Sequence, residues 1–378
     1  MEKIYVNLIF ALVFGCLIGI IGYYVFIDQK IKEDKPKTNM TIIKTDNQTQ
    51  IIKFAQIITI KPDCTECISS EGVVGSIKKA FDQINIKYNE SILSANSEKA
   101  ITLINKYDIK FLPTVVVIPN NELNSQFTDA WKTAGSIEKD NSLILRNIFP
   151  PYYDVNSKSI KGLVSATAIS ASNCNECMNA SDYFDSLELA QFGVIFKKKE
   201  IINETDPKAI QLIEKYQIKK LPTLIIDKEI SSYPVVNQIN KILSDEGDVF
   251  VIRDVYPPYK LINGSDKKII GRVEAKYITN SSCKECFDPK DLSKYMVQSL
   301  GVVILNETTF EVTNKSAIEL INKYNISSIP AIIYSSDISA YPDFDKLWIN
   351  ESNTIENDGS FVFRAYNFLN ATYQNLTK

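Results

Sequence analysis

Six of the seven cysteines in this 378-residue chain form three Cys-x-x-Cys pairs at nearly constant spacing. The pairs are Cys64 and Cys67, Cys174 and Cys177, and Cys283 and Cys286, and their first members lie 110 and 109 residues apart. Two cysteines three residues apart can close a disulfide, and the free N–H groups at the start of a helix stabilise a thiolate. We therefore expect each pair to open a helix, with its first cysteine as the nucleophile and its second as the resolving thiol.

The composition removes most other chemistry from consideration. The chain has no histidine, which excludes Ser–His–Asp, Cys–His and histidine–zinc mechanisms. Four-cysteine zinc sites usually bring their pairs within about 20 residues, so pairs this far apart predict no metal, and no cofactor is expected. The net charge of −3, from 42 basic and 45 acidic residues, argues against nucleic acid as a partner. Redox activity and static bridging both remain open for the cysteine pairs.

A proline repeats together with the cysteines. Pro113, Pro222 and Pro330 follow the first cysteine of their pair by 49, 48 and 47 residues, each in a stretch Lys-Tyr-x-Ile-x-x-(Leu/Ile)-Pro. Self-similarity at a fixed period is the signature of tandem homologous units. We therefore divide the chain into three repeats, at 51–158, 159–266 and 267–378.

Each repeat shows the same expected order of elements. A strand leads into the cysteine pair, a helix follows, a second strand and a second helix come next, and the proline opens a third strand. The leading strands are expected at 51–60, 160–169 and 269–278, and second strands at 192–196 and 300–304. Turn residues at 246–248 and 357–359 indicate a closing hairpin. This order predicts an α/β sandwich with a mixed sheet.

A Cys-x-x-Cys after a strand, with Ile-x-x-(Leu/Ile)-Pro about 48 residues later, resembles the thioredoxin-like superfamily. The resemblance covers all three repeats and implies three tandem thioredoxin-like domains in an arrangement similar to protein disulfide isomerases. It implies that the six paired cysteines are catalytic. It also implies that Pro113, Pro222 and Pro330 are cis, pack against the cysteines and bind extended substrate.

The repeats also depart from that family. Thioredoxins usually have tryptophan before the first cysteine, where this chain has Asp63, Asn173 and Ser282. A glutamate precedes each second cysteine (Glu66, Glu176 and Glu285), and a carboxylate beside a thiolate raises the pKa of the thiol. The pairs should therefore be poor oxidants, acting as reductants, low-potential relays or static bridges. Sequons lie near the second and third pairs, so Cys64 is the strongest candidate for a working nucleophile.

The N-terminal segment predicts a membrane anchor. Residues 4–27 carry no charge, and 24 helical residues span roughly 36 Å, enough to cross a bilayer core. We assign 1–27 as an uncleaved transmembrane helix and the polar segment 28–50 as a stalk. Four lysines follow the anchor and one precedes it, which by charge alone would place the bulk of the chain inside the cell.

Glycosylation sequons favour the opposite side of the membrane. Thirteen occur where the composition gives about four by chance, and all lie beyond the anchor. They are Asn39, Asn47, Asn89, Asn179, Asn203, Asn263, Asn280, Asn306, Asn314, Asn325, Asn350, Asn370 and Asn375. Disulfides also persist outside the reducing cytosol. We therefore expect a membrane-anchored, extracytoplasmic protein at the cell surface.

Two functions fit these patterns. The first is thiol–disulfide exchange on exported protein clients or with a redox partner. The second is a non-enzymatic, glycosylated surface or filament-forming protein whose modules are pinned by disulfides and associate with one another. Other repeated residues are expected to be structural. Arg146, Arg253 and Arg364 should form salt bridges or cover strands, and Trp131 and Trp348 should pack in cores or against hairpins. The Pro-Pro-Tyr segments at 150–152 and 257–259 should stiffen inter-repeat joints.

Overall fold

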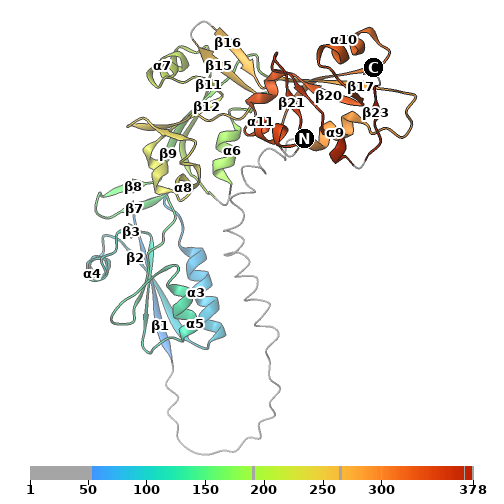
Figure 1. Ribbon diagram of the computed structural model, residues 1–378. Helices are drawn as coiled ribbons and strands as arrows, with labels where there is room; N and C mark the ends of the chain where they lie inside the picture. The colour runs from blue at the N-terminus through green and yellow to red at the C-terminus, as the bar shows by residue number, and fades with distance from the viewer. Residues whose placement is uncertain (1–52, 190–191, 264–265, 299, 370, 377–378) are drawn as a thin grey trace, which may run out of the picture.

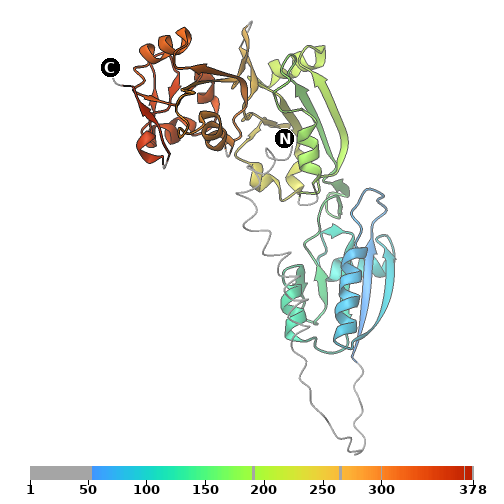
Figure 2. The same cartoon turned by 90° about the vertical axis from the view of Figure 1, so that its right-hand side faces the viewer.

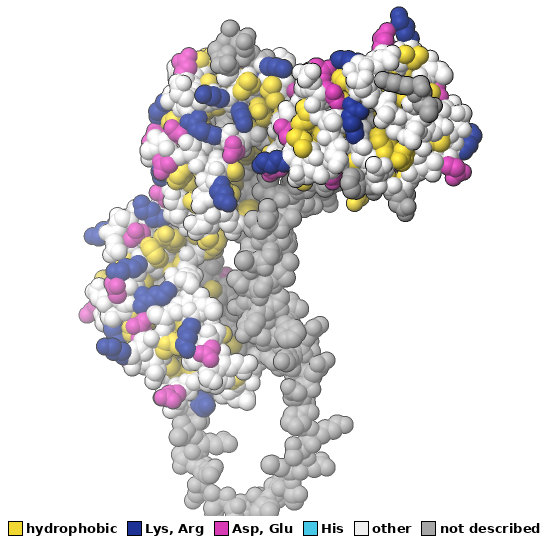
Figure 3. All heavy atoms as spheres, viewed as in Figure 1, with side chains coloured by type: hydrophobic (Ala, Val, Ile, Leu, Met, Phe, Trp, Pro, Cys, Tyr) yellow, Lys and Arg dark blue, Asp and Glu magenta, His cyan; other side chains and the backbone are white. Residues whose placement is uncertain are grey.

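A computed structural model describes residues 53–189, 192–263, 266–298, 300–369 and 371–376. The predicted anchor and stalk lie outside these residues. Within the described part of the chain, none of the helices combines the length and the apolar character that crossing a bilayer would require. The described residues form three similar α/β units that follow one another in a bent row (Figures 1 and 2). Basic and acidic side chains are interspersed over the face drawn in Figure 3.

Each unit contains one five-stranded mixed sheet. In the first unit the order is β2-β1-β4-β6-β5, with β1 parallel to β2 and the other neighbours antiparallel. These strands are β1 (Phe54–Lys61), β2 (Lys87–Ser94), β4 (Thr114–Pro119), β5 (Gly135–Ile137) and β6 (Leu143–Leu145). Apolar residues on both faces of β1 and β4 explain their place at the centre of the sheet.

The second and third units repeat this order. The second sheet is β10-β9-β12-β14-β13 and the third is β18-β17-β20-β22-β21. The second is built from β9 (Val164–Ser170), β10 (Phe196–Asn203), β12 (Thr223–Asp227), β13 (Leu243–Asp245) and β14 (Val249–Ile252). The third is built from β17 (Val273–Thr279), β18 (Ile304–Glu311), β20 (Ala331–Tyr334), β21 (Thr354–Ile355) and β22 (Phe361–Val362). The predicted strands after the prolines and the two predicted hairpin turns are confirmed.

Helices cover both faces of each sheet. In the first unit, α3 (Glu71–Gln83) and α5 (Ser125–Trp131) pack on one face, and α4 (Glu98–Lys106) packs on the other. In the second unit the corresponding helices are α6 (Asp182–Glu188), η1 (Lys228–Ser232), α8 (Val236–Ile239) and α7 (Pro207–Lys215). In the third unit they are α9 (Pro289–Gln298), η2 (Ser336–Ala340), α11 (Phe344–Asn350) and α10 (Lys315–Lys323). A further 3-10 turn, η3 (Tyr366–Phe368), follows in the third unit. Trp131 and Trp348 are buried and donate to backbone carbonyls, which confirms their core role.

Two expectations about strands were wrong. The second strands begin later than predicted, at Phe196 and Ile304, because the apolar runs before them bend at Gly193 and Gly301, which have φ of 55° and 59°. The strands themselves are polar because they lie at a sheet edge and are largely exposed. The expected leading strands of units two and three each divide in two, at Gly162 and Gly271.

The residues before these glycines belong to hairpins between the units. Strand β7 (Tyr152–Asp154) pairs with β8 (Ser159–Lys161), and β15 (Tyr259–Asn263) pairs with β16 (Asp266–Ile270). The Pro150–Pro151 and Pro257–Pro258 peptide bonds that precede them are cis. At Gly271, with φ of 90°, a Cβ atom would lie 2.5 Å from the Cβ of Pro257. The joint therefore packs its prolines directly on the backbone of the next unit.

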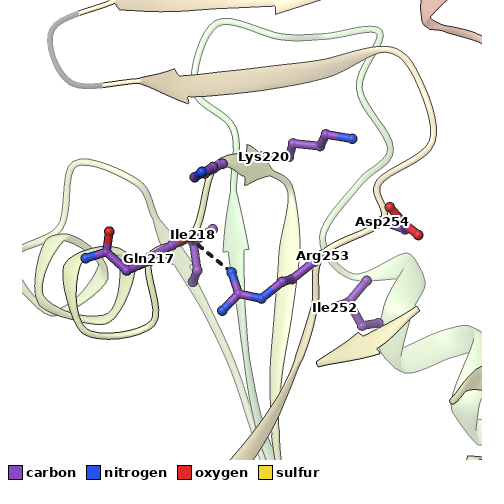
Figure 4. A pocket seen from close by; sticks show the side chains of 7 residues that line it. Gln217, Ile218, Lys220, Ile252, Arg253 and Asp254 are labelled. Atoms are coloured by element: carbon purple, nitrogen blue, oxygen red, sulfur yellow. Dashed lines mark hydrogen bonds between the residues drawn. The ribbon is translucent and has the colours of Figure 1, made fainter. Parts of the chain in front are cut away.

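The three repeated arginines are structural. Arg253 Nη2 donates to the carbonyl of Tyr216 at 2.6 Å and to Glu246 Oε1 at 2.7 Å. Its Nη1 donates to the carbonyl of Gln217 at 3.1 Å, the contact drawn beside a hollow in Figure 4. Arg146 and Arg364 make the equivalent contacts in units one and three. Each arginine thus binds the carbonyls at the end of a helix, and the predicted salt bridges are confirmed.

Candidate functional site

The three cysteine pairs are disulfides in loops that follow the leading strands. The expectation that each pair opens a helix is wrong, because α3, α6 and α9 begin only at Glu71, Asp182 and Pro289. The loop between each cysteine pair and its helix contains polar side chains that accept hydrogen bonds from backbone N–H groups. Ser69 Oγ accepts one from Glu71, and Asp288 Oδ1 accepts one from Lys290. The helix dipole acts within its first turn, so it does not supply the predicted thiolate stabilisation.

The first pair lies in an open cavity of about 740 Å³. Cys64, Cys67 and Pro113 all line this cavity, and both cysteines are half-buried. The backbone N–H of Cys67 lies 3.0 Å from Cys64 Sγ. An incoming sulfur can therefore approach the first pair from solvent beside the cis proline.

A carboxylate stands next to the first sulfur. Glu66 Oε2 lies 3.9 Å from Cys64 Sγ and accepts a hydrogen bond of 2.8 Å from Thr65 Oγ1. The Thr65 hydroxyl and backbone N–H groups lower the pKa of Glu66, so it is ionised at neutral pH. Its negative charge opposes the formation of a thiolate on Cys64.

The peptide bonds before Pro113, Pro222 and Pro330 are cis, as the resemblance implies. The short strand that ends at each proline is already paired by a later segment of the chain. Strand β3 (Phe111–Leu112) pairs with β7, β11 (Lys220–Leu221) with β15, and β19 (Ser328–Ile329) with β23 (Gln374–Asn375), all antiparallel. The edge that the resemblance assigns to extended substrate is therefore occupied in all three units, and substrate binding by these prolines stays a prediction.

The second pair is enclosed by residues from two units. Cys174 is only 8% exposed. Arg272, at the start of the third unit, donates to Glu176 Oε2 at 2.7 and 3.2 Å and to the carbonyl of Asn173 at 3.3 Å. The backbone N–H of Glu176 and Arg272 together lower the pKa of the Glu176 carboxyl group. The loop that carries the second disulfide is thereby fastened to the next unit.

A buried ion pair lies on the other side of this loop. Lys260, on β15, donates to Glu204 and to the Ser172 carbonyl at 3.0 Å, and Ser172 Oγ donates to Glu204 at 2.6 Å. The Lys260 and Glu204 side chains are 8% and 2% exposed. The sequence does not reveal these contacts, because a charged residue such as Lys260 looks the same in sequence whether its side chain faces solvent or a buried carboxylate.

The C-terminal segment packs against the loop of the third pair, whose two cysteines are half-buried like those of the first pair. Cys286 forms a parallel bridge with Thr372, and the N–H of Phe287 donates to the Thr372 carbonyl at 3.2 Å. Asn280 Nδ2 donates to Gln374 Oε1 at 2.7 Å. In the first unit the Ile68 N–H makes the corresponding bond to the Pro151 carbonyl, and the first pair lines the cavity described above.

Most of the sequon asparagines that the structure describes are at the surface. Asn203 and Asn280 are half-buried. The exposed ones are Asn89, Asn179, Asn306, Asn314, Asn325, Asn350 and Asn375. Asn39, Asn47 and Asn370 lie outside the described residues, and the side chain of Asn263 also lies outside what the structure describes. Glycosylation of these residues stays a prediction, and Asn280 differs from the rest because its amide nitrogen already donates within the fold.

No group of three or more potential metal ligands occurs among the described residues.

Comparison with known proteins gives only distant likenesses. No family model and no curated protein matches the chain.

Several solved structures are similar to the chain at very low identity. ERdj5 form II is 8% identical over 89% of this chain and 41% of its own, with a TM-score of 0.15. Human ERp44 is 9% identical over 79% of this chain and 86% of its own, with a TM-score of 0.13. The NTD_N/C domain of alkylhydroperoxide reductase AhpF from Enterococcus faecalis is 10% identical over 47% of this chain and 83% of its own, with a TM-score of 0.14. This chain therefore spans about two fifths of ERdj5, and at such TM-scores none of the three bears on its function.

Proposed function

We propose that this chain is a membrane-anchored, extracytoplasmic thiol–disulfide exchange protein with three thioredoxin-like repeats, in which Cys64 and Cys67 react with exported protein clients. The observation that supports this most is the open cavity shared by Cys64, Cys67 and the cis proline Pro113. The loops of the second and third pairs are held by Arg272 and by the C-terminal segment, so we assign these two pairs a structural role.

The exchange reaction balances within the first pair. In the reduced protein, the Cys64 thiolate attacks one sulfur of a client disulfide, the client S–S bond breaks, and one client thiolate leaves. The Cys67 thiolate then attacks Cys64 Sγ, the mixed disulfide breaks, and the second client thiol is released. The client gains two electrons and the Cys64–Cys67 disulfide forms, which an external dithiol must reduce again.

The direction of transfer follows from the charge beside the sulfur. Because Glu66 opposes the thiolate and no helix begins at Cys64, the reduced form lacks the stabilisation that makes other Cys-x-x-Cys pairs strong oxidants. We therefore propose that the first pair works as a reductant or isomerase of client disulfides.

The rival function is a glycosylated surface or filament-forming protein without catalysis. Two observations favour it: the occupied edges beside all three prolines, and the prolines of the joints packed on the next unit. In that case the Cys64–Cys67 disulfide would be a third static bridge.

The catalytic activity of a single and a double cysteine variant separates the two functions. The full chain, reduced with dithiothreitol as the regenerating dithiol, is assayed for insulin reduction and for reactivation of scrambled ribonuclease. The proposal predicts that C64S abolishes turnover and that C283S with C286S retains most of it. Absence of turnover in the wild-type chain, or equal loss in both variants, would favour the structural protein. A mobility shift of native material on glycosidase treatment tests the extracytoplasmic placement.

A further inference from the structure

The cavity around the first pair is also lined by residues of α3 and β2, and we call this part of it the groove. Its floor includes Thr59 and Ile92, which are paired neighbours in the sheet, and its wall includes Val74 and Gly75 of α3. Ile92 is 66% exposed, more than almost any other large apolar side chain in the described chain. A Cβ atom placed on Gly75 would meet nothing within 4 Å. The groove therefore offers an apolar surface that the chain itself leaves open.

The opposite approach, along the proline edge, is closed. Leu112, immediately before the cis proline, is paired with Tyr153 of β7. The pairing continues on both sides, since Val155 N–H donates to the Lys110 carbonyl at 2.9 Å and Ile68 N–H donates to the Pro151 carbonyl at 2.8 Å. A client strand could reach this edge only after breaking these hydrogen bonds.

The charges around the groove have an acidic excess near the sulfur. Lys78 and Glu90 neutralise one another in a 2.9 Å ion pair between α3 and β2. Of the other charged residues that line the cavity, Asp63 and Glu71 are acidic and Lys61 is basic. Glu66, beside Cys64, adds a further carboxylate, and Lys197 of the second unit acts on it as a positive charge. Three acidic and two basic residues therefore leave the cysteine end of the groove with one net negative charge.

We propose that clients reach Cys64 through the groove between α3 and β2, not along the proline edge. The client this groove fits is an extended disulfide-bonded segment with a basic residue next to its cysteine and an apolar side chain that packs on Ile92. This inference rests on the proposed function, because it assumes that Cys64 reacts with client disulfides.

The test uses two matched peptides, each joined through its single cysteine to a fluorescent reporter thiol. One has lysine on both sides of the cysteine and the other has glutamate, and both have a leucine nearby. Reduction by the prereduced full chain releases the reporter, and 2-hydroxyethyl disulfide serves as a small comparison disulfide. We expect the lysine peptide to react about fivefold faster than the glutamate peptide at low salt, with the difference shrinking as salt is added.

Two glycines of the same helix provide the variant and its control. Gly75→Leu places a side chain in the groove, whereas Gly72→Leu places one in open space outside it. We expect Gly75→Leu to slow the peptides at least about fivefold more than it slows 2-hydroxyethyl disulfide, because the small disulfide needs no groove. Gly72→Leu should show no such selective effect.

The outcomes distinguish the inference from the proposed function. If the wild-type chain reduces no peptide and no small disulfide, the proposed function fails. If it reduces the peptides but Gly75→Leu and Gly72→Leu behave alike, the function stands and the groove is wrong. A second measurement uses the C67S chain with a peptide trapped on Cys64. Retained hydrogen-exchange protection of Val155 N–H supports the groove, and its loss would show that the client displaces β7.

Discussion

Removing one guanidinium should open the second cysteine pair to reduction. Arg272 makes three hydrogen bonds to the loop that carries Cys174, two of them to the Glu176 carboxylate. Arg272→Ala removes all three without changing the backbone at the joint. The loop then loses its attachment to the third unit, and the disulfide becomes accessible through a local opening.

The size of the effect follows from the geometry. Charge-assisted hydrogen bonds are stronger than neutral ones, but the Arg272 and Glu176 side chains are 32% and 24% exposed, so solvent screens part of the attraction. We estimate a cost of about 1–2 kcal/mol to the closed loop. Since 1.4 kcal/mol is a factor of ten, Arg272→Ala should speed reduction of the second pair roughly 5- to 30-fold.

The assay is timed reduction of the native full chain by a water-soluble phosphine, followed by alkylation and mass spectrometry of each cysteine. Arg253→Ala is the matched control. Arg253 forms a 2.7 Å ion pair with Glu246, and its side chain is 35% exposed, but it lies at the helix end of the same unit. Arg253→Ala should change the rate at which the Cys174–Cys177 disulfide is reduced by less than about twofold, because the contacts of Arg253 do not hold the cysteine loop.

The same contact gives a pH dependence. The pKa of Glu176 is lowered in the folded chain, so the contact stabilises the closed loop above the ordinary glutamate pKa of about 4.3 and is lost as pH falls through the lowered value. Wild-type reduction of the second pair should therefore stay slow near neutral pH and rise only in acid, after correction with a model disulfide. Equal rates in wild type and Arg272→Ala, or equal acceleration by Arg253→Ala, would refute this reasoning.

Two further substitutions test other parts of the structure. Glu66→Gln removes a charge 3.9 Å from Cys64 Sγ and should lower the pKa of the Cys64 thiol by about one unit, measured from the pH dependence of alkylation; an unchanged pKa would contradict the proposed role of the carboxylate. Gly271→Ala should cost about 2–4 kcal/mol, because φ is 90° and the new Cβ would lie 2.5 Å from Pro257, whereas Gly247→Ala, at φ of 86° in open space, should cost about 1 kcal/mol. Hydrogen exchange under denaturant measures the loss of unfolding free energy in each variant. Equal losses in the two variants would show that the joint does not pack tightly.

The sequence predicted the features that local pattern controls. The helices before the prolines, the strands after them and the hairpin turns were found, because apolar spacing and turn residues determine them. The polar strands β10 and β18 were misplaced, since an edge strand exposed to solvent has little apolar pattern. The position of the cysteine pairs relative to their helices was also wrong, because loop residues such as Ser69 set the helix start.

The site depends on contacts between distant segments, which the sequence does not reveal. Nothing in the Pro-Pro-Tyr segment indicates that the strand after it pairs with the edge before a cis proline about 40 residues earlier. Nor does an arginine after a glycine indicate that it will hold the cysteine loop of the preceding unit. The three cysteine pairs therefore look equivalent in sequence, although the structure holds the loops of the second and third pairs by Arg272 and by the C-terminal segment.

We propose that only the first cysteine pair exchanges electrons in the folded chain. A redox titration of the native full chain tests it most directly, with alkylation and mass spectrometry reporting each pair separately. We predict that Cys64 and Cys67 are reduced and reoxidised reversibly while the other two disulfides stay intact until the chain unfolds. A common midpoint for all three pairs, or a first pair that resists reduction like the others, would contradict the account.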